Sequence, residues 1–359
     1  MLEEQLNQLY EGYGYRKFRM SKFEDYDLYA QNKDFLKKGH IITFTDVDGS
    51  LKALKPDITL SIIKNNSGDS EKVYYNENVY REMGGTFKEI LQVGVESVGQ
   101  IDPYAEAEVI ALAAKSLEIL SEDYVLDLSD VSFIRCLLGG MNLSQRDQEQ
   151  ALALIAQKNA PGIQSMADRG ILTAQDAQAI QELMGIYAPL KEGIAQAGRL
   201  ARDNQSWEIL RQLSVTASML EAFGLNGRIR LDFSLVNSMD YYNGVIFQGF
   251  LPNIPFPALS GGRYDNLPRK MGKQVGAIGF ALYMGRLEQY FSQERQYDAE
   301  VLLTYGPDAD LAKLAAFAEQ IRAKGCTVRC EREIGPSAPV RCRTKVRYYD
   351  GLRPEEVSL

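Results

Sequence analysis

Apolar positions along the chain recur with the periods of both helices and strands. Leu2, Leu6 and Leu9 fall on one face of a helix at the start of the chain. Residues 15–29 are dense in aromatic and charged side chains, which is typical of an extended segment. Two short strands are expected on either side of residues 46–50, Asp-Val-Asp-Gly-Ser, because Asp-Gly suits a tight hairpin.

Further helices are predicted after Pro56 and from Pro103 onward, since proline is favoured in the first turn of a helix. Asp57 and Thr59 are the two candidate caps of the first of these helices. Residues 131–223 are rich in Ala, Gln, Leu and Glu, with few β-branched runs. This composition predicts a helical insertion.

Two strands at 71–82 and 86–99 are expected to form a hairpin through the short turn Met-Gly-Gly. In the second strand, apolar residues alternate with Gln92, Gly94 and Glu96. Because alternate residues of a strand share one face, Gln92 and Glu96 point the same way. The pattern indicates a sheet with one packed side and one wet side.

More strands are predicted at 227–236, 239–250 and 274–282, with a proline-rich loop between the last two. The residues after 296 read as strand, helix and strand, with a final strand possible at 345–351. Runs of strands and a separate helical block together predict the α+β class.

Composition narrows the class of protein. The chain has 359 residues, of which 45% are hydrophobic and 25% charged, as expected of a globular protein with a large core. The net charge of −8 lowers the expectation of a nucleic-acid partner. No apolar stretch is long enough to cross a membrane, and the start of the chain lacks the pattern of a signal peptide. We therefore expect a cytoplasmic protein without nucleic-acid or membrane partners.

The cysteines and the single histidine offer little chemistry. Cys326, Cys330 and Cys342 cluster near the end of the chain, and Cys136 is remote. A zinc site would need a further ligand, and His40 is far away in the sequence, so free thiols in a reducing compartment are the favoured interpretation. His40 is expected in a solvated loop, and a histidine-based nucleophilic mechanism would depend on it alone. No metal or cofactor is predicted.

Five short motifs carry polar side chains, each with an ordinary structural explanation such as a cap, a turn or a solvated strand face. Their candidate residues are Lys55, Asp57 and Thr59; Arg81, Gln92 and Glu96; Asp240, Tyr241 and Tyr242; Gly261, Gly262, Arg263 and Asp265; and Arg286. Singly, none of these motifs indicates a function.

In this order, the motifs resemble the core of class II aminoacyl-tRNA synthetases, specifically the histidyl branch. ILQVGVE at 90–96 is similar to the end of motif 2, and MDYYNGVIF at 239–247 to the histidine-reading strand. SGGRYDNL at 260–267 resembles the glycine-rich loop, and GFALYMGRL at 279–287 resembles motif 3. The resemblance covers about residues 10–290 and implies an antiparallel sheet flanked by helices.

The resemblance also implies a pocket for free histidine. Asp57, Thr59 and Gln92 match positions whose acceptor groups hold the α-ammonium. Glu96 and Tyr242 match positions that reach the imidazole, which a carboxylate suits. The remaining positions that the resemblance gives to the pocket are its walls and a motif 2 arginine: Tyr241, Gly261, Gly262 and Arg81.

Departures from the synthetase pattern affect activation of an amino acid. Asn237-Ser238-Met239 stands where the family has Arg-Gly-Leu, and losing one preorganised donor to developing charge costs about 10²–10³ in rate. Tyr283 replaces a glycine and is expected to fill nucleotide space, although Arg286 is kept. Lys55 and Arg263 are the two candidates to balance a ligand carboxylate.

A kept pocket with a damaged nucleotide site resembles the regulatory subunits of ATP phosphoribosyltransferase. That family is not catalytic itself; it activates the short-form catalytic subunit in histidine biosynthesis and mediates feedback inhibition by histidine. It assembles as dimers within a hetero-octamer. The alternatives are a divergent histidyl-tRNA synthetase and a synthetase-like sensor domain, such as that of a translation kinase.

The resemblance divides the chain into three parts. A synthetase-like core would comprise residues 1–130 and 224–295, with the helical insertion at 131–223. Residues 296–359 would form a small, abbreviated C-terminal α/β unit.

Overall fold

The fold is described from a computed structural model, which divides the chain into two compact units, Met1–Leu287 and Glu288–Leu359. The residues that the structure describes are 2–36, 40–67, 70–225, 227–236, 241–291, 297–333 and 340–353. Each unit is described by itself.

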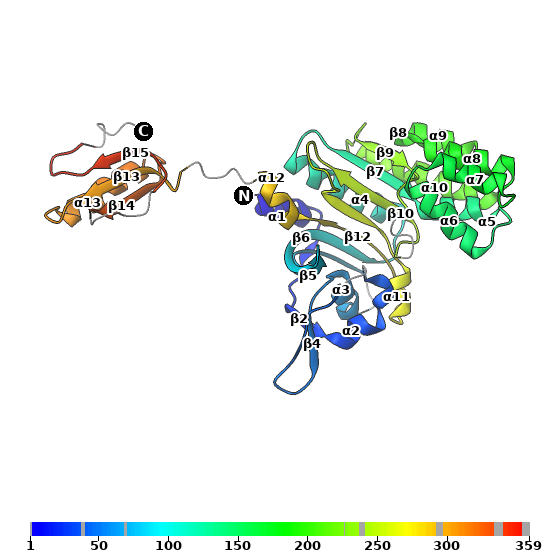
Figure 1. Cartoon of the computed structure of the whole chain (residues 1–359), viewed down its shortest axis with the longest axis horizontal. Helices are drawn as coiled ribbons and strands as arrows, with labels where there is room; N and C mark the ends of the chain where they lie inside the picture. Colours follow the sequence, from blue (N-terminus) through cyan, green and yellow to red (C-terminus); the bar gives the residue numbers. More distant parts are fainter. Residues whose placement is uncertain are drawn as a thin grey trace. The chain divides into compact units, whose positions relative to one another are not determined.

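A nine-stranded, mostly antiparallel sheet forms the centre of the first unit (Figure 1). Its strands lie in the order β1-β5-β6-β12-β11-β10-β7-β9-β8, and the pairs β1–β5 and β7–β9 are parallel. The bounds are β1 Arg16–Lys17, β5 Glu71–Met83, β6 Thr86–Gly99, β7 Val125–Asp130, β8 Tyr187–Pro189, β9 Ile229–Asp232, β10 Val245–Phe250, β11 Leu259–Arg263 and β12 Gly276–Leu282.

The predicted hairpin of β5 and β6 is confirmed. Gly84 and Gly85 form its two-residue turn, with φ of 60° and 77°. Two consecutive positive φ values suit the twist of a hairpin, and glycine adopts them without steric cost. The long hairpin fixes the register of β6, which carries Gln92 and Glu96.

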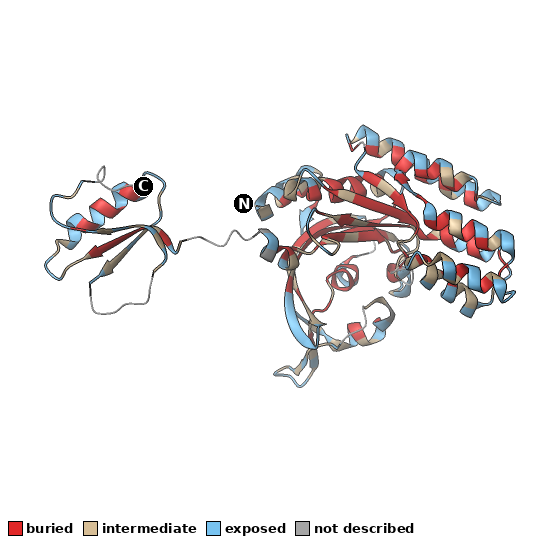
Figure 2. Ribbon diagram, turned by 45° about the horizontal axis from the view of Figure 1, so that its top comes forward, coloured by how far each residue is buried: buried red, intermediate tan, exposed pale blue. Residues whose placement is uncertain are grey.

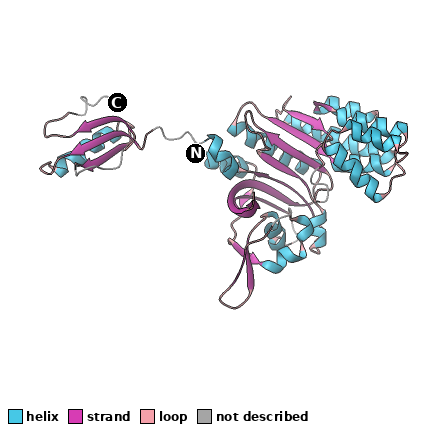
Figure 3. Ribbon diagram, in the orientation of Figure 1, coloured by secondary structure: helices cyan, strands magenta, loops and turns pink. Residues whose placement is uncertain are grey.

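Helices cover both faces of the sheet (Figure 3). α1 (Leu2–Gly12) and α4 (Pro103–Leu120) pack together on one face. α4 begins where predicted, because Asp102 accepts the Ala105 N–H at 2.8 Å and Pro103 occupies the first turn. On the other face, α3 (Thr59–Asn65) packs on β6 and α11 (Asn266–Lys270) packs on β12.

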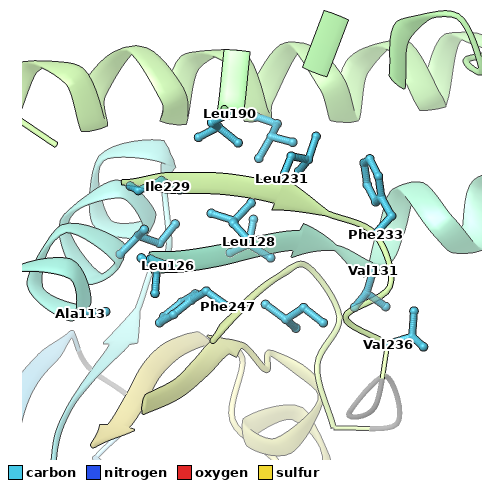
Figure 4. Packing of buried hydrophobic residues seen from close by; sticks show 14 of the residues in the cluster. Ala113, Leu126, Leu128, Val131, Leu190, Ile229, Leu231, Phe233, Val236 and Phe247 are labelled. Carbon is cyan, nitrogen blue, oxygen red and sulfur yellow. The ribbon is translucent and has the colours of Figure 1, made fainter. Parts of the chain in front are cut away.

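The segment predicted to be helical is confirmed as such, with one exception. Its helices are α5 Val131–Gly139, α6 Gln145–Ala156, α7 Ala160–Asp168, α8 Ala174–Gly185, α9 Leu190–Gly198 and α10 Asn204–Ala222. The unexpected element is the three-residue strand β8, which extends the sheet beyond β9. Leu190 of α9 packs toward Leu231 of β9, and α10 packs on α4, so these helices share the core of the first unit (Figure 4).

A small three-stranded sheet stands beside α2 (Tyr26–Gln31). It contains the predicted strands around the Asp-Gly turn, in the order β2-β4-β3, with bounds β2 Phe23–Asp25, β3 Thr43–Thr45 and β4 Leu51–Leu54. The expectation of an extended segment at 15–29 is wrong at its end, because Tyr26–Gln31 forms α2. Leu28 and Tyr29 of this helix are buried, and packing decides the local structure there.

The second unit confirms the predicted β-α-β arrangement. β13 (Ala299–Tyr305) lies between β14 (Val328–Arg332) and β15 (Cys342–Arg347), and both pairings are parallel. α13 (Leu311–Arg322) connects the first two strands and buries Phe317. The final strand begins three residues earlier than predicted.

Figure 2 shows that burial concentrates in the sheet and in the helix faces against it. The four cysteines are unpaired and partly buried. Within the described residues, no group of three or more His, Cys, Asp or Glu side chains is arranged to hold a metal ion. In the same part of the chain, no helix has the length and apolarity needed to cross a membrane.

Candidate functional site

The candidate pocket lies on the face of β6 that carries Gln92 and Glu96. The regular strand places both side chains on one face, as predicted. This face is not open to water, contrary to expectation, because the exposed fractions of Gln92 and Glu96 are 3% and 2%. A second core cluster, which includes residues of α2 and α3, covers this side of the sheet.

Glu96 is the centre of the pocket's polar network. Its carboxylate accepts a hydrogen bond from the Thr59 hydroxyl at 2.8 Å and a second one from the Tyr264 hydroxyl. Burial raises the pKa of Glu96 to about 8, with a smaller contribution from the nearby charge of Asp57. At neutral pH this buried carboxyl group therefore holds a proton for most of the time.

Two glycines make room for this network. Gly279 of β12 lies directly opposite Glu96, and a Cβ there would stand 1.7 Å from a Glu96 carboxylate oxygen. Gly94 lies between Gln92 and Glu96, and a Cβ there would stand 2.6 Å from the Tyr75 hydroxyl. The Tyr75 ring therefore crosses the strand at Gly94, and its hydroxyl donates to the Phe280 carbonyl at 3.3 Å.

Of the two candidate caps of the helix after Pro56, Asp57 takes this role. Asp57 accepts the Leu60 N–H at 3.0 Å and so caps α3, while the Thr59 hydroxyl is used by Glu96. Arg81 of β5 lies beside Asp57, with 3.5 Å between its guanidinium and the second carboxylate oxygen. The Arg81 Nε also donates to the Pro56 carbonyl at 2.6 Å.

Three tyrosine rings form an aromatic wall. Tyr241 and Tyr242 precede β10 instead of lying within it, so the predicted strand begins too early. Their ring centroids are 4.7 Å apart in an edge-to-face arrangement, and Tyr241 is 5.3 Å from Tyr264. Tyr264 was not among the residues predicted from the sequence, although it follows Gly262 by two positions and so shares its side of the chain.

The two glycines of the Ser-Gly-Gly-Arg motif have different surroundings. Both lie in strand β11 and not in the expected loop. A Cβ at Gly262 would stand 2.8 Å from Tyr242, so this glycine borders the pocket. A Cβ at Gly261 would meet Phe247 at 2.6 Å, in the core on the opposite face of the sheet. The assignment of Gly261 to the pocket wall is therefore wrong.

Neither cation considered as a partner for a ligand carboxylate lies beside Glu96. Arg263 shares the face of Gly261, where it pairs with Asp265 at 3.0 Å and approaches Glu106 of α4 at 3.6 Å. Lys55 is 1% exposed, and its ammonium comes within 4.0 Å of Glu77. The triplet at 237–239 and the neighbouring Asp240 lie outside the described residues.

Tyr283 and Arg286, which the resemblance gives to the nucleotide side, both have partners within the chain. The Tyr283 hydroxyl forms a hydrogen bond with that of Ser260, which shares a strand face with Gly262. The Arg286 guanidinium lies 3.8 Å from the centroid of the Phe256 ring, a cation–π distance. One face of this guanidinium is therefore already stacked on an aromatic ring of the chain itself.

His40 contacts none of the side chains that bond to Glu96. Its side chain is 84% exposed, and its Nδ1 forms a hydrogen bond with Glu82. The prediction of a solvated position is confirmed.

The assembled side chains favour a polar ligand that carries hydrogen-bond donors. The described side chains of the candidate site include two carboxyl groups, an amide and several hydroxyls, whereas the one arginine among them is engaged by Asp57. Acceptor oxygens of this kind suit an ammonium or a ring N–H. The aromatic wall of Tyr241, Tyr242 and Tyr264 suits a flat ring.

Comparison with protein families gives a match over most of the chain. The family model described as histidyl-tRNA synthetase matches residues 1–287. Several curated relatives are ATP phosphoribosyltransferase regulatory subunits. The one from Acetivibrio thermocellus is 28% identical, over 78% of this chain and 69% of the relative. The one from Alkaliphilus metalliredigens is 24% identical, over 94% of this chain and 89% of the relative.

Solved structures share the fold. An ATP phosphoribosyltransferase regulatory subunit/histidyl-tRNA synthetase from Bacillus halodurans C is 22% identical with a TM-score of 0.78, covering 96% of this chain and 92% of that one. Histidyl-tRNA synthetase from Nostoc is 17% identical with a TM-score of 0.73, and the match covers 94% of this chain and 82% of that one. A chain of the ATP phosphoribosyl transferase (HisG:HisZ) complex from Thermotoga maritima is 17% identical with a TM-score of 0.63. This match covers 79% of this chain and 96% of that one.

Proposed function

The chain belongs to the histidyl-tRNA synthetase family, and from this premise we propose that it is a regulatory subunit of ATP phosphoribosyltransferase. In this role it activates the short-form catalytic subunit in the first step of histidine biosynthesis and transmits feedback inhibition by histidine. The names of its curated relatives support the regulatory role in histidine biosynthesis. The proposed assembly is a dimer of this chain within a hetero-octamer.

The observation that carries the proposal is the network around Glu96. A carboxyl group with a pKa of about 8 meets a histidine ring whose ordinary pKa is about 6.5. The bound pair needs only one proton between the carboxyl group and the ring. The same complex forms whether Glu96 or the imidazole carries that proton before binding. Asp57, Thr59 and Gln92 supply the acceptors that the α-ammonium needs.

The nucleotide side supports a role without amino-acid activation. Tyr283 is bonded to Ser260, and Arg286 stacks on Phe256, so two positions that the resemblance gives to ATP are used within the chain. Binding a nucleotide there would first have to displace these contacts. Feedback by histidine needs only that the ligand binds two assembly states unequally.

Calorimetry of the full chain tests the pocket. We expect histidine to bind with one site per chain, without any dependence on ATP. Glu96→Gln is expected to weaken binding, whereas Glu89→Gln, an exposed change on the same strand, should leave it unchanged. Glutamine as ligand, which lacks the ring, controls for general amino-acid binding. Equal affinity for glutamine and histidine would reject the pocket assignment.

Co-expression with the short catalytic subunit of the same organism tests the regulatory role. We expect the two chains to co-purify and the complex to form phosphoribosyl-ATP faster than the catalytic subunit alone. Histidine should reduce that rate, and less so with Glu96→Gln. Histidine-dependent ATP–pyrophosphate exchange or charging of tRNA by this chain would instead support the alternative, a divergent histidyl-tRNA synthetase.

A further inference from the structure

A groove of about 580 Å³ lies between α9 and α10, away from the residues of the pocket around Glu96. Its lining residues come from these two helices and from Arg199, which directly follows α9. Neither the proposed histidine pocket nor the fold explains it.

The geometry of the groove matches a helix. From α9 the lining residues are 191, 194, 195 and 198, and from α10 they are 207, 210, 211 and 214. Each set follows the i, i+3, i+4, i+7 spacing of a single helix face. At 1.5 Å per residue, two such faces make a trough about 10 Å long, which is two turns of a third helix laid along it.

The floor of the groove is apolar. Ile194 and Leu210 form it, and Trp207, the only tryptophan of the chain, stands at its side with 55% of its surface exposed. The ring packs against Gly198, where a Cβ would stand 3.4 Å from it. A half-exposed tryptophan beside an apolar floor is the type of residue that dominates binding energy at protein interfaces.

The charged residues that line the groove are all cations. Three of its lining residues are cations and none is a carboxylate, although the chain as a whole has a net charge of −8. Lys191 is paired with Glu221 and Arg211 with Glu208, both outside the lining. Arg199 has no carboxylate partner among the described residues, so it is the cation available to an incoming acid.

We propose that this groove docks an amphipathic helix of the short catalytic subunit, with its apolar face on Trp207 and an acidic residue against Arg199. The choice of this partner rests on the proposed function; the helical form and the acidic flank rest on the shape and charge of the groove. The contact would place the α9–α10 surface at the interface of the assembly.

Variants of the full chain, co-expressed with the catalytic subunit, test the contact. Trp207→Ala is expected to weaken the complex about thirtyfold, as for an interface hot spot. Arg199→Glu is expected to weaken it at least about tenfold, by placing like charges together. Arg146→Glu, an exposed reversal on α6 of the same insertion, is the matched control and should leave the affinity unchanged. Thermal melting establishes that each variant is folded.

A photo-reactive amino acid at Ala195, which is exposed within the groove, identifies the occupant directly. We expect a crosslink to a helix of the catalytic subunit that has Asp or Glu beside an apolar face. Unchanged affinity of both variants, or a crosslink to a second copy of this chain, would overturn the docking proposal while the proposed function stands. Failure of the unmodified chains to form any complex would overturn both.

Discussion

Replacing Glu96 with glutamine should stabilise the protein in the absence of ligand, and the gain should grow with pH. The carboxyl group is 2% exposed, and its pKa is raised from 4.5 to about 8. Between these values the folded chain binds more protons than the unfolded chain, so stability falls as pH rises. Glutamine has the shape of the protonated acid but cannot ionise, and it removes this dependence.

The magnitude follows from the two pKa values. With 4.5 for the unfolded and about 8 for the folded state, ionisation of Glu96 opposes folding by about 1 kcal/mol at pH 5 and about 3 kcal/mol at pH 7. The advantage of Glu96→Gln should therefore grow by about 2 kcal/mol between these pH values. A constant offset, from altered bonds to Thr59 and Tyr264, would shift the whole curve without changing this slope.

Urea denaturation followed by tryptophan fluorescence measures the effect. Trp207 is the only tryptophan and lies in the first unit, so its emission reports on that unit alone. The control is Glu108→Gln, a buried glutamate whose partners are Lys72 at 2.6 Å and Tyr15 at 3.1 Å. Losing that paired charge should destabilise by about 1–3 kcal/mol. Parallel pH profiles for the parent chain and Glu96→Gln would refute the reasoning.

Three further outcomes are expected. The affinity for histidine, measured by calorimetry, should be constant between about pH 6.5 and 8 and should fall on either side of that range. Below it, both free partners are protonated and binding must release one proton; above it, both are deprotonated and binding must take one up. Gly279→Ala should abolish histidine binding and lower the melting temperature, since its Cβ would stand 1.7 Å from Glu96. Asp203→Ala should destabilise the first unit by about 1 kcal/mol in urea denaturation, because it removes the capping box with Ser206 at the start of α10.

Local sequence signals were sufficient where a single strand or helix decides the outcome. The alternation around Gly94 gave the shared face of Gln92 and Glu96, and the Gly-Gly turn gave the β5–β6 hairpin. The last strand of the second unit begins three residues before its predicted start, because boundaries are the part of an element that a sequence pattern specifies least.

Contacts between strands that are far apart in the sequence could not be predicted from local patterns. Tyr75, Tyr264 and Gly279 border Glu96 only because β5, β11 and β12 are placed around β6, an order that no local pattern specifies. The same limit explains the error at Gly261, since the face on which a strand residue lies depends on its register with neighbours. Gly262 stays a predicted wall residue, and a Cβ there would stand 2.8 Å from Tyr242.

Under the proposed function, the partners of three arginines account for binding without activation better than the loss of any single residue. Arg81 is held by Asp57 and by the Pro56 carbonyl. Arg263 faces α4, and Arg286 stacks on Phe256. Transition-state stabilisation requires donors aimed in advance at the developing charge, and each of these three guanidiniums is directed to a partner within the chain. The proposed function keeps the acceptors for a ligand ammonium and ring, so it treats affinity for an amino acid and the ability to activate it as separable properties.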